Sequence, residues 1–175
     1  MQHVHHLKRT LAFSARELRE IILAWGLLSI AFAIVLHGFS LDLTFLVAIA
    51  LSAVTAGIGF VFHELSHKYM ALKYNLAAEF YSNKLMLAFA ILTSFLGIIF
   101  AAPGAVAIMG QTTREKHGKI ALAGPVANIV IAAIFLCGFV FLKGAPFPDV
   151  YRYGFQINAF LALFNLLPIF GFDGL

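Results

Sequence analysis

The stretch LTFLVAIALSAVTAGIGFVFHELSHKY, residues 43–69, decides the fold, because an apolar run long enough to cross a bilayer ends in a cluster of polar groups. A helix needs about 20 apolar residues to cross the hydrocarbon core, and the run Leu43–Phe62 meets that length. We expect the helix to continue through His63, Glu64 and His67. Ionisable side chains are costly at membrane depth and by default indicate a functional site.

The composition of the whole chain is that of a membrane protein. Of its 175 residues, 62% are hydrophobic and 11% are charged, and the mean hydropathy is +0.94. Soluble domains are about 45–50% apolar and about 25% charged. The net charge of +4 is best interpreted as a topology signal, and no basic run predicts nucleic-acid binding. The single cysteine, Cys137, can form no internal disulfide.

About four transmembrane helices are expected. The apolar runs that predict them are Ile21–Leu36, the run from Leu43 through the HELSH stretch to about Tyr74, Ile120–Leu142 and Phe155–Phe172. Basic residues before the first run predict that residues 1–20 face the cytoplasm of a cell-membrane protein. Residues 21–175 are then a single transmembrane core. The three N-terminal histidines precede every predicted element, which favours a solvated end over a metal site.

The run Leu85–Ala102 poses a topological problem. Basic residues flank it on both sides, so both flanks should be cytoplasmic. The run also breaks at Ala101–Gly104, where Pro and Gly interrupt a helix. We therefore predict an all-α polytopic membrane protein with about four transmembrane helices plus a re-entrant, partly extended hairpin. The alternative is a true third span, which would invert the topology of everything after it.

The HELSH stretch is an HExxH motif. Positions i and i+4 of a helix share a face, so His63 and His67 can bind one Zn²⁺, and Glu64 can take a proton from a zinc-bound water. Five-residue patterns also occur by chance. The alternative is a helix end that extends polar groups to the interface, with Lys68 as the first solvated residue.

Zinc sites with an open position usually have three protein ligands, so one more is needed. Glu79 is too close in sequence, Asp42 and Asp149 should lie on the opposite face of the membrane, and His117 is in a polar loop. Asp173 remains. If residues 85–112 form a hairpin, His63 and Asp173 each lie about 20 residues along an inward-running span, about 30 Å deep at 1.5 Å per residue.

Two asparagines in apolar runs have alternative interpretations. Asn165 precedes Asp173 across a helix broken by Pro168 and Gly171. It could stabilise an oxyanion near the zinc or make an interhelical hydrogen bond. Asn128, in AGPVAN, is better explained as a contact between helices, since Gly124 and Ala127 permit close helix approach.

Together these motifs resemble the site-2 proteases, the intramembrane zinc metalloproteases, and archaeal members in particular. HELSH matches their HExxH signature, and Asn165, Pro168, Asp173 and Gly174 match their NxxPxxxxDG stretch. The resemblance covers roughly residues 20–175. It implies zinc ligands at His63, His67 and Asp173, a catalytic base at Glu64, and an assisting role for Asn165.

The resemblance also implies hydrolysis of a peptide bond within or near the transmembrane segment of a protein or peptide substrate, in contact with the bilayer. The substrate path maps onto the region around Pro103–Met109, where an unwound substrate can pair as a strand. Family members usually continue past the DG pair, so we expect the chain ending at Leu175 to be truncated. The alternative function is an inactive membrane adaptor or a transporter-like protein, but the inverted repeats typical of transporters are not evident.

Overall fold

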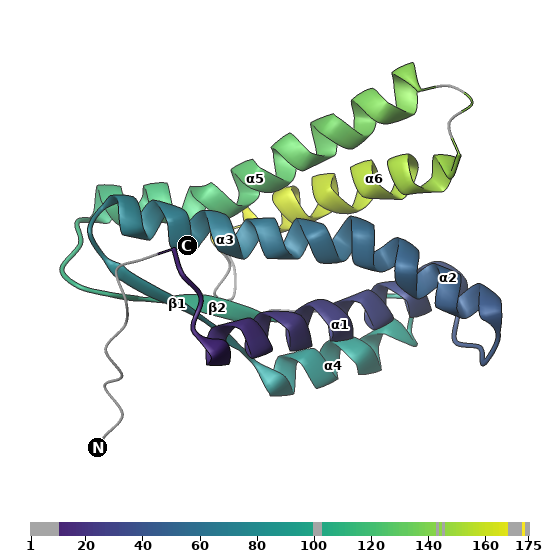
Figure 1. The fold of residues 1–175 in the computed structure, drawn as a ribbon, viewed down its shortest axis with the longest axis horizontal. Helices are drawn as coiled ribbons and strands as arrows, with labels where there is room; N and C mark the ends of the chain where they lie inside the picture. The colour runs from purple at the N-terminus through teal and green to yellow at the C-terminus, as the bar shows by residue number, and fades with distance from the viewer. Residues whose placement is uncertain (1–10, 100–102, 143, 145, 168–172, 174–175) are drawn as a thin grey trace.

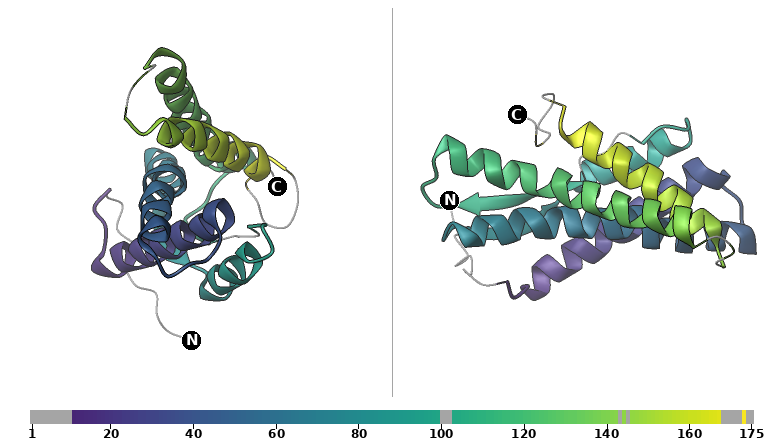
Figure 2. Two further views of the ribbon diagram at one scale, coloured as in Figure 1. Left: turned by 90° about the vertical axis from the view of Figure 1, so that its right-hand side faces the viewer. Right: turned by 90° about the horizontal axis from the view of Figure 1, so that it is seen from above.

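The computed structural model describes residues 11–99, 103–142, 144, 146–167 and 173. Within them, three helices are long and apolar enough to cross a membrane: α1 (Ala15–His37), the continuous helix Leu43–Lys73, and α5 (Arg114–Phe141). The continuous helix consists of α2 (Leu43–Ser52), a π-helical turn (Ala53–Gly57) and α3 (Ile58–Lys73). It lies between the pair formed by α5 and α6 (Pro148–Asn165) and the pair formed by α1 and α4 (Lys84–Ser94) (Figures 1 and 2).

The helix α1 begins before the predicted Ile21. Ser14 is its N-cap, and the Ser14 side chain accepts a hydrogen bond from the Glu17 N–H. Such caps satisfy amide groups that have no partner within the helix, so the polar turn that precedes the apolar run is helical as well.

The helix α6 (Pro148–Asn165) has 18 residues and runs back along α5 (Figure 1). It is not among the helices long and apolar enough to cross, and it ends before the predicted Phe172. Pro168 and Gly171 lie outside the described residues.

The segment expected to be re-entrant is a hairpin built on a small sheet. Strands β1 (Ala77–Ser82) and β2 (Gly104–Met109) are antiparallel, with Ser82 paired to Gly104. The chain therefore leaves the sheet at the end of β1 and re-enters it at the start of β2, directly beside the point where it left. Between the strands, α4 (Lys84–Ser94) has 11 residues, about 17 Å of helix, which is too short to cross. The sequence predicted the extended part at β2 but not the strand β1.

A buried apolar cluster holds the sheet against the helices. It consists of Ile21, Ala24 and Leu28 from α1, Phe60 from α3, Phe80 from β1 and Leu87 from α4. The rings of Phe60 and Phe80 meet edge to face at 5.7 Å. Because Phe60 precedes the HELSH stretch on α3, this cluster fixes the position of the sheet relative to that stretch.

Candidate metal centre and active site

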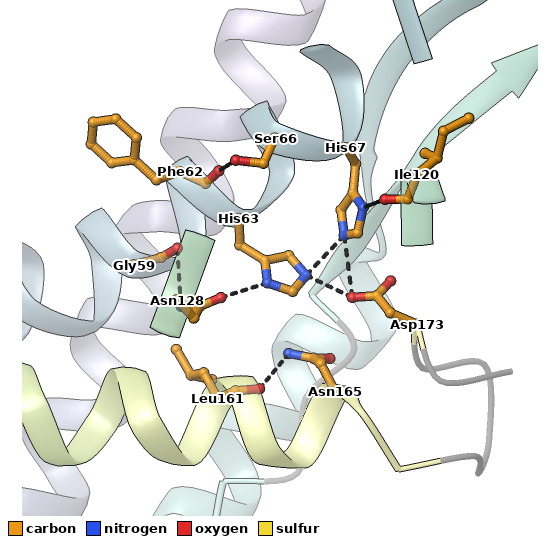
Figure 3. A network of polar contacts seen from close by, with 10 residues as sticks. All are labelled: Gly59, Phe62, His63, Ser66, His67, Ile120, Asn128, Leu161, Asn165 and Asp173. Carbon is orange, nitrogen blue, oxygen red and sulfur yellow. Dashed lines mark hydrogen bonds and ion pairs between the residues drawn. The ribbon is translucent and has the colours of Figure 1, made fainter. Parts of the chain in front are cut away.

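The two HELSH histidines lie one turn apart on the same face of α3, and both are buried. Their Nε2 atoms are 3.0 Å apart. The Asp173 Oδ2 atom lies 2.9 Å from His63 Nε2 and 3.2 Å from His67 Nε2 (Figure 3). The structure thus brings together the three side chains that the sequence singled out as metal ligands.

The outer nitrogen of each histidine faces an oxygen acceptor. His63 Nδ1 lies 2.6 Å from Asn128 Oδ1, and His67 Nδ1 lies 2.8 Å from the Ile120 carbonyl (Figure 3). The orientation of the Asn128 amide follows from its Nδ2, which donates to the Gly59 carbonyl. Because oxygens of this kind only accept, each Nδ1 donates to its oxygen, and the neutral form of each histidine presents a lone pair at Nε2.

Three lone pairs therefore converge on one point: the two Nε2 atoms and Asp173 Oδ2. Asp173 Oδ2 is buried and receives no hydrogen bond from the described residues. A cation bound at this point would accept all three lone pairs. Two imidazoles and one carboxylate form a donor set that binds zinc and leaves a fourth coordination position open. The residues present therefore fit zinc.

Glu64 lies beside this point with a carboxylate that is available for proton transfer. The residue is 8% exposed, and its Oε2 is buried with no hydrogen-bond partner among the described residues. Glu64 and the three donor residues line one cavity of about 300 Å³. A general base requires a carboxylate oxygen that is free to accept a proton beside the point where water would bind, and Glu64 Oε2 lies next to the three candidate metal donors.

Asn165, the last residue of α6, also lines the cavity. Its Nδ2 donates to the Leu161 carbonyl at 2.9 Å, a bond within its own helix rather than between helices (Figure 3). A carboxamide nitrogen carries two hydrogens. One therefore fixes the side chain and the other is available to an oxygen in the cavity.

The rejected ligand candidates lie elsewhere. Glu79 accepts hydrogen bonds from Ser14 and Tyr81, and Asp42 caps α2. Asp149 is in the first turn of α6. His117 borders the cavity but is exposed and does not belong to the group of metal donors. The three N-terminal histidines lie outside the described residues.

Two buried asparagines support His63. Asn128 does bridge helices, as the sequence indicated, since its Nδ2 donates to Gly59 of α3 and Asn158 of α6. It also holds His63, which the sequence did not reveal. Asn158 in turn donates to the Thr55 carbonyl in the π-helical turn at 3.3 Å. Asn158 was missed entirely, although an asparagine in an apolar run is itself a signal.

Gly124 explains how α5 comes so close to the histidines. A Cβ atom added at this position would lie 2.6 Å from His63 Nε2. Only glycine fits there. The small residue in AGPVAN was correctly associated with close helix approach, but what it approaches is the pair of histidines of the candidate metal centre.

Comparison with known proteins agrees with this geometry. Residues 50–156 match the model of Peptidase family M50. The chain belongs to peptidase family M50. A candidate zinc metalloprotease of Methanocaldococcus jannaschii is 42% identical over 166 residues, which cover 93% of this chain and 83% of that protein. A second zinc metalloprotease of the same organism is 29% identical over 124 residues, 67% of this chain and 30% of that protein. No solved structure matches significantly.

Membership in family M50, with the archaeal relative, makes the chain a zinc metalloendopeptidase of the site-2 protease family. The apolar helices make it a multi-pass membrane protein. The expectations of fold class, family, enzyme class and cofactor are therefore confirmed.

Proposed function

We propose that this site-2 protease hydrolyses a peptide bond within or near the transmembrane segment of a protein or peptide substrate. His63, His67 and Asp173 would hold the zinc, Glu64 would act as the base, and Asn165 would assist. The observation that carries the proposal is the convergence of three lone pairs beside Glu64, whose Oε2 has no hydrogen-bond partner among the described residues.

When zinc is bound in a site of this kind, it acts as a Lewis acid that lowers the pKa of water and polarises a carbonyl group. Glu64 accepts the proton of the attacking water as the new carbon–oxygen bond forms. The second hydrogen of the Asn165 amide donates to the oxygen on which negative charge develops. As the carbon–nitrogen bond breaks, Glu64 delivers the proton to the departing amine. Glu64 thus performs both proton transfers, and Asn165 stabilises the negative charge that develops on the oxygen.

The outer edge of β2, which pairs with no further strand among the described residues, supports strand pairing of the substrate. Gly104, Val106 and Ile108 line the same cavity as the metal donors. A helical substrate uses its carbonyl groups for its own hydrogen bonds, so it must unwind before cleavage. Pairing with a sheet edge holds an unwound chain by main-chain hydrogen bonds.

Charge distribution supports an active site toward the cytoplasmic side of the membrane. The N-terminal ends of α1 and α5 lie beside the C-terminal end of α3: Lys68 contacts Glu17, and Lys116 lies over the Tyr74 ring at 5.7 Å. Basic residues gather at this end: Arg16, Arg19, Lys73, Arg114, Lys116 and Lys119. Clusters of this sign usually face the cytoplasm.

The test compares the unaltered chain with Glu64→Gln, using a synthetic transmembrane peptide in lipid vesicles. Glutamine keeps the size of the side chain but cannot accept a proton. We expect one bond of the peptide to be cleaved by the unaltered chain only, while both proteins hold equal zinc. Cleavage by the Glu64→Gln chain at an unchanged rate would refute the assigned mechanism.

A further inference from the structure

A second cluster of buried charges lies outside the metal centre. Lys68, the residue directly after His67, places its Nζ 2.6 Å from Glu17 Oε2, and the two side chains are only 3% and 2% exposed. Lys68 is therefore buried, and the alternative interpretation of the sequence, in which Lys68 is the first solvated residue, is wrong. Its Nζ also lies 4.3 Å from the centre of the Phe13 ring. Buried charges are costly unless they are paired, so this pair constrains where α1 and α3 sit.

The same carboxylate also holds the sheet. Glu17 Oε1 accepts the backbone N–H of Phe80, in the middle of β1, at 3.2 Å. One side chain of α1 thus links Lys68 of the HELSH helix to the backbone of a strand. The contacts span 51 and 63 positions of sequence.

The direction of that N–H defines the geometry of the sheet. In an antiparallel pair, residues alternate between those that exchange hydrogen bonds and those whose backbone groups point outward. Because the Phe80 N–H points to Glu17, Phe80 and its partner Val106 are of the outward type. The bond from Asn83 N–H to the Pro103 carbonyl, 2.9 Å, fits the same alternation. Glu17 therefore occupies the outer edge of β1, on the side of the sheet opposite to the outward-pointing backbone groups of Val106.

We propose that Glu17 and Lys68 form a positioning pair that sets which substrate bond reaches the active site. The inference rests on the proposed pairing of the substrate with β2. A substrate strand on β2 takes its position from Val106 and its neighbours, while His63, Glu64 and His67 take theirs from α3. Glu17 joins the two through Phe80 and Lys68. It also leaves β2 as the edge available to a substrate, since its carboxylate occupies β1 at Phe80.

The decisive variant is Glu17→Gln with Lys68→Met, because it removes both charges and leaves no buried ion unpaired. The introduced glutamine can still accept the Phe80 N–H, but nothing then links it to α3. The matched control is Glu115→Gln with Lys119→Met, which removes an exposed pair at the start of α5. Products of a transmembrane peptide are identified by mass spectrometry, with kcat, KM and zinc content measured separately.

For Glu17→Gln with Lys68→Met we expect full zinc content, cleavage spread over neighbouring peptide bonds, and a fall in kcat of up to about 10²-fold, the cost of a misplacement of about 1 Å. KM should change little, because the β2 edge is intact. The control should cleave as the unaltered chain does. Unchanged cleavage position and kcat in the double variant would overturn the proposal.

Two further measurements cover other outcomes. If the double variant does not fold, Glu17→Asp keeps the charge but shortens the side chain, and we expect it too to spread the cleavage positions. Single-site cleavage at full rate by Glu17→Asp would overturn the role.

If the unaltered chain cleaves nothing, the proposed function fails instead. Hydrogen exchange at the Phe80 amide then tests the link: exchange should be slow, and faster in Glu17→Ala with Lys68→Met, which removes the acceptor and leaves no buried ion unpaired. Equal exchange in both would overturn it.

Discussion

Asn128 Oδ1 lies 2.6 Å from His63 Nδ1, and this bond fixes the nitrogen of His63 that faces Asp173. Partners of this kind, behind a metal-binding histidine, contribute about 10–100-fold in metal affinity. Asn128→Ala should therefore weaken zinc binding by about that factor, without altering any residue assigned to the metal. Competition with a calibrated chelator measures the affinity. Affinity equal to that of the unaltered chain would show that His63 needs no such partner.

Gly124 makes a separate prediction about the same centre. Gly124→Ala places a methyl group 2.6 Å from His63 Nε2, so we expect the site to lose zinc even though Ala favours a helix more than Gly does. Gly118→Ala is the matched control in the same helix, because nothing lies within 4 Å of its added Cβ. The zinc content measured after dialysis distinguishes the Gly124→Ala variant from the Gly118→Ala control. Full zinc occupancy in the Gly124 variant would contradict the close approach of α5.

Asn158 should matter for stability as well as for the metal. It is fully buried and donates to the carbonyls of Thr55 and Gly154. Asn158→Ala leaves these carbonyls without that donor, a cost of about 1–3 kcal/mol. It also removes the oxygen that receives Asn128 Nδ2. The temperature of thermal unfolding in detergent and the affinity for zinc should both fall. A lower unfolding temperature with unchanged zinc affinity would mean that Asn128 keeps its position without Asn158.

Asn165 should affect the rate and not the metal. Removal of a single oxyanion donor costs about 10²–10³ in kcat. Asn165→Ala is thus expected to retain zinc and to bind a transmembrane peptide with a similar KM while kcat falls by about 10²-fold. If instead zinc is lost, Asn165 serves chiefly to hold the end of α6 near Asp173.

Strand addition at β2 can be tested with proline. Val106 points its N–H away from β1, so Val106→Pro removes a group that makes no bond to β1 and that the proposed substrate would use. We expect zinc to be retained and KM to rise. Val106→Ala keeps the N–H and controls for the lost side chain, while Ala105→Pro removes a bond within the sheet and should destabilise it. An equal KM for Val106→Pro and Val106→Ala would exclude pairing at this residue.

The parts of the site that the sequence predicted are those governed by local periodicity or by depth. His63 and His67 share a face because the helical repeat places them there. Asp173 was selected by counting residues along spans, and the structure places its carboxylate against both histidines.

The parts that the sequence did not predict depend on contacts between distant segments. The strand β1 owes its position to pairing with β2 and to Glu17 on α1. Lys68 resembled a solvated lysine because its partner lies 51 residues earlier. Asn158 meets the π-helical turn 103 residues away. No periodicity within a single run encodes such pairs.

The central claim is that His63, His67 and Asp173 hold the zinc. Anomalous diffraction from crystals of the zinc-loaded protein, recorded on both sides of the zinc absorption edge, tests it most directly. The account predicts one peak per chain, within bonding distance of both Nε2 atoms and the Asp173 carboxylate. A zinc peak elsewhere, or bound by the histidines with Asp173 turned away, would contradict it.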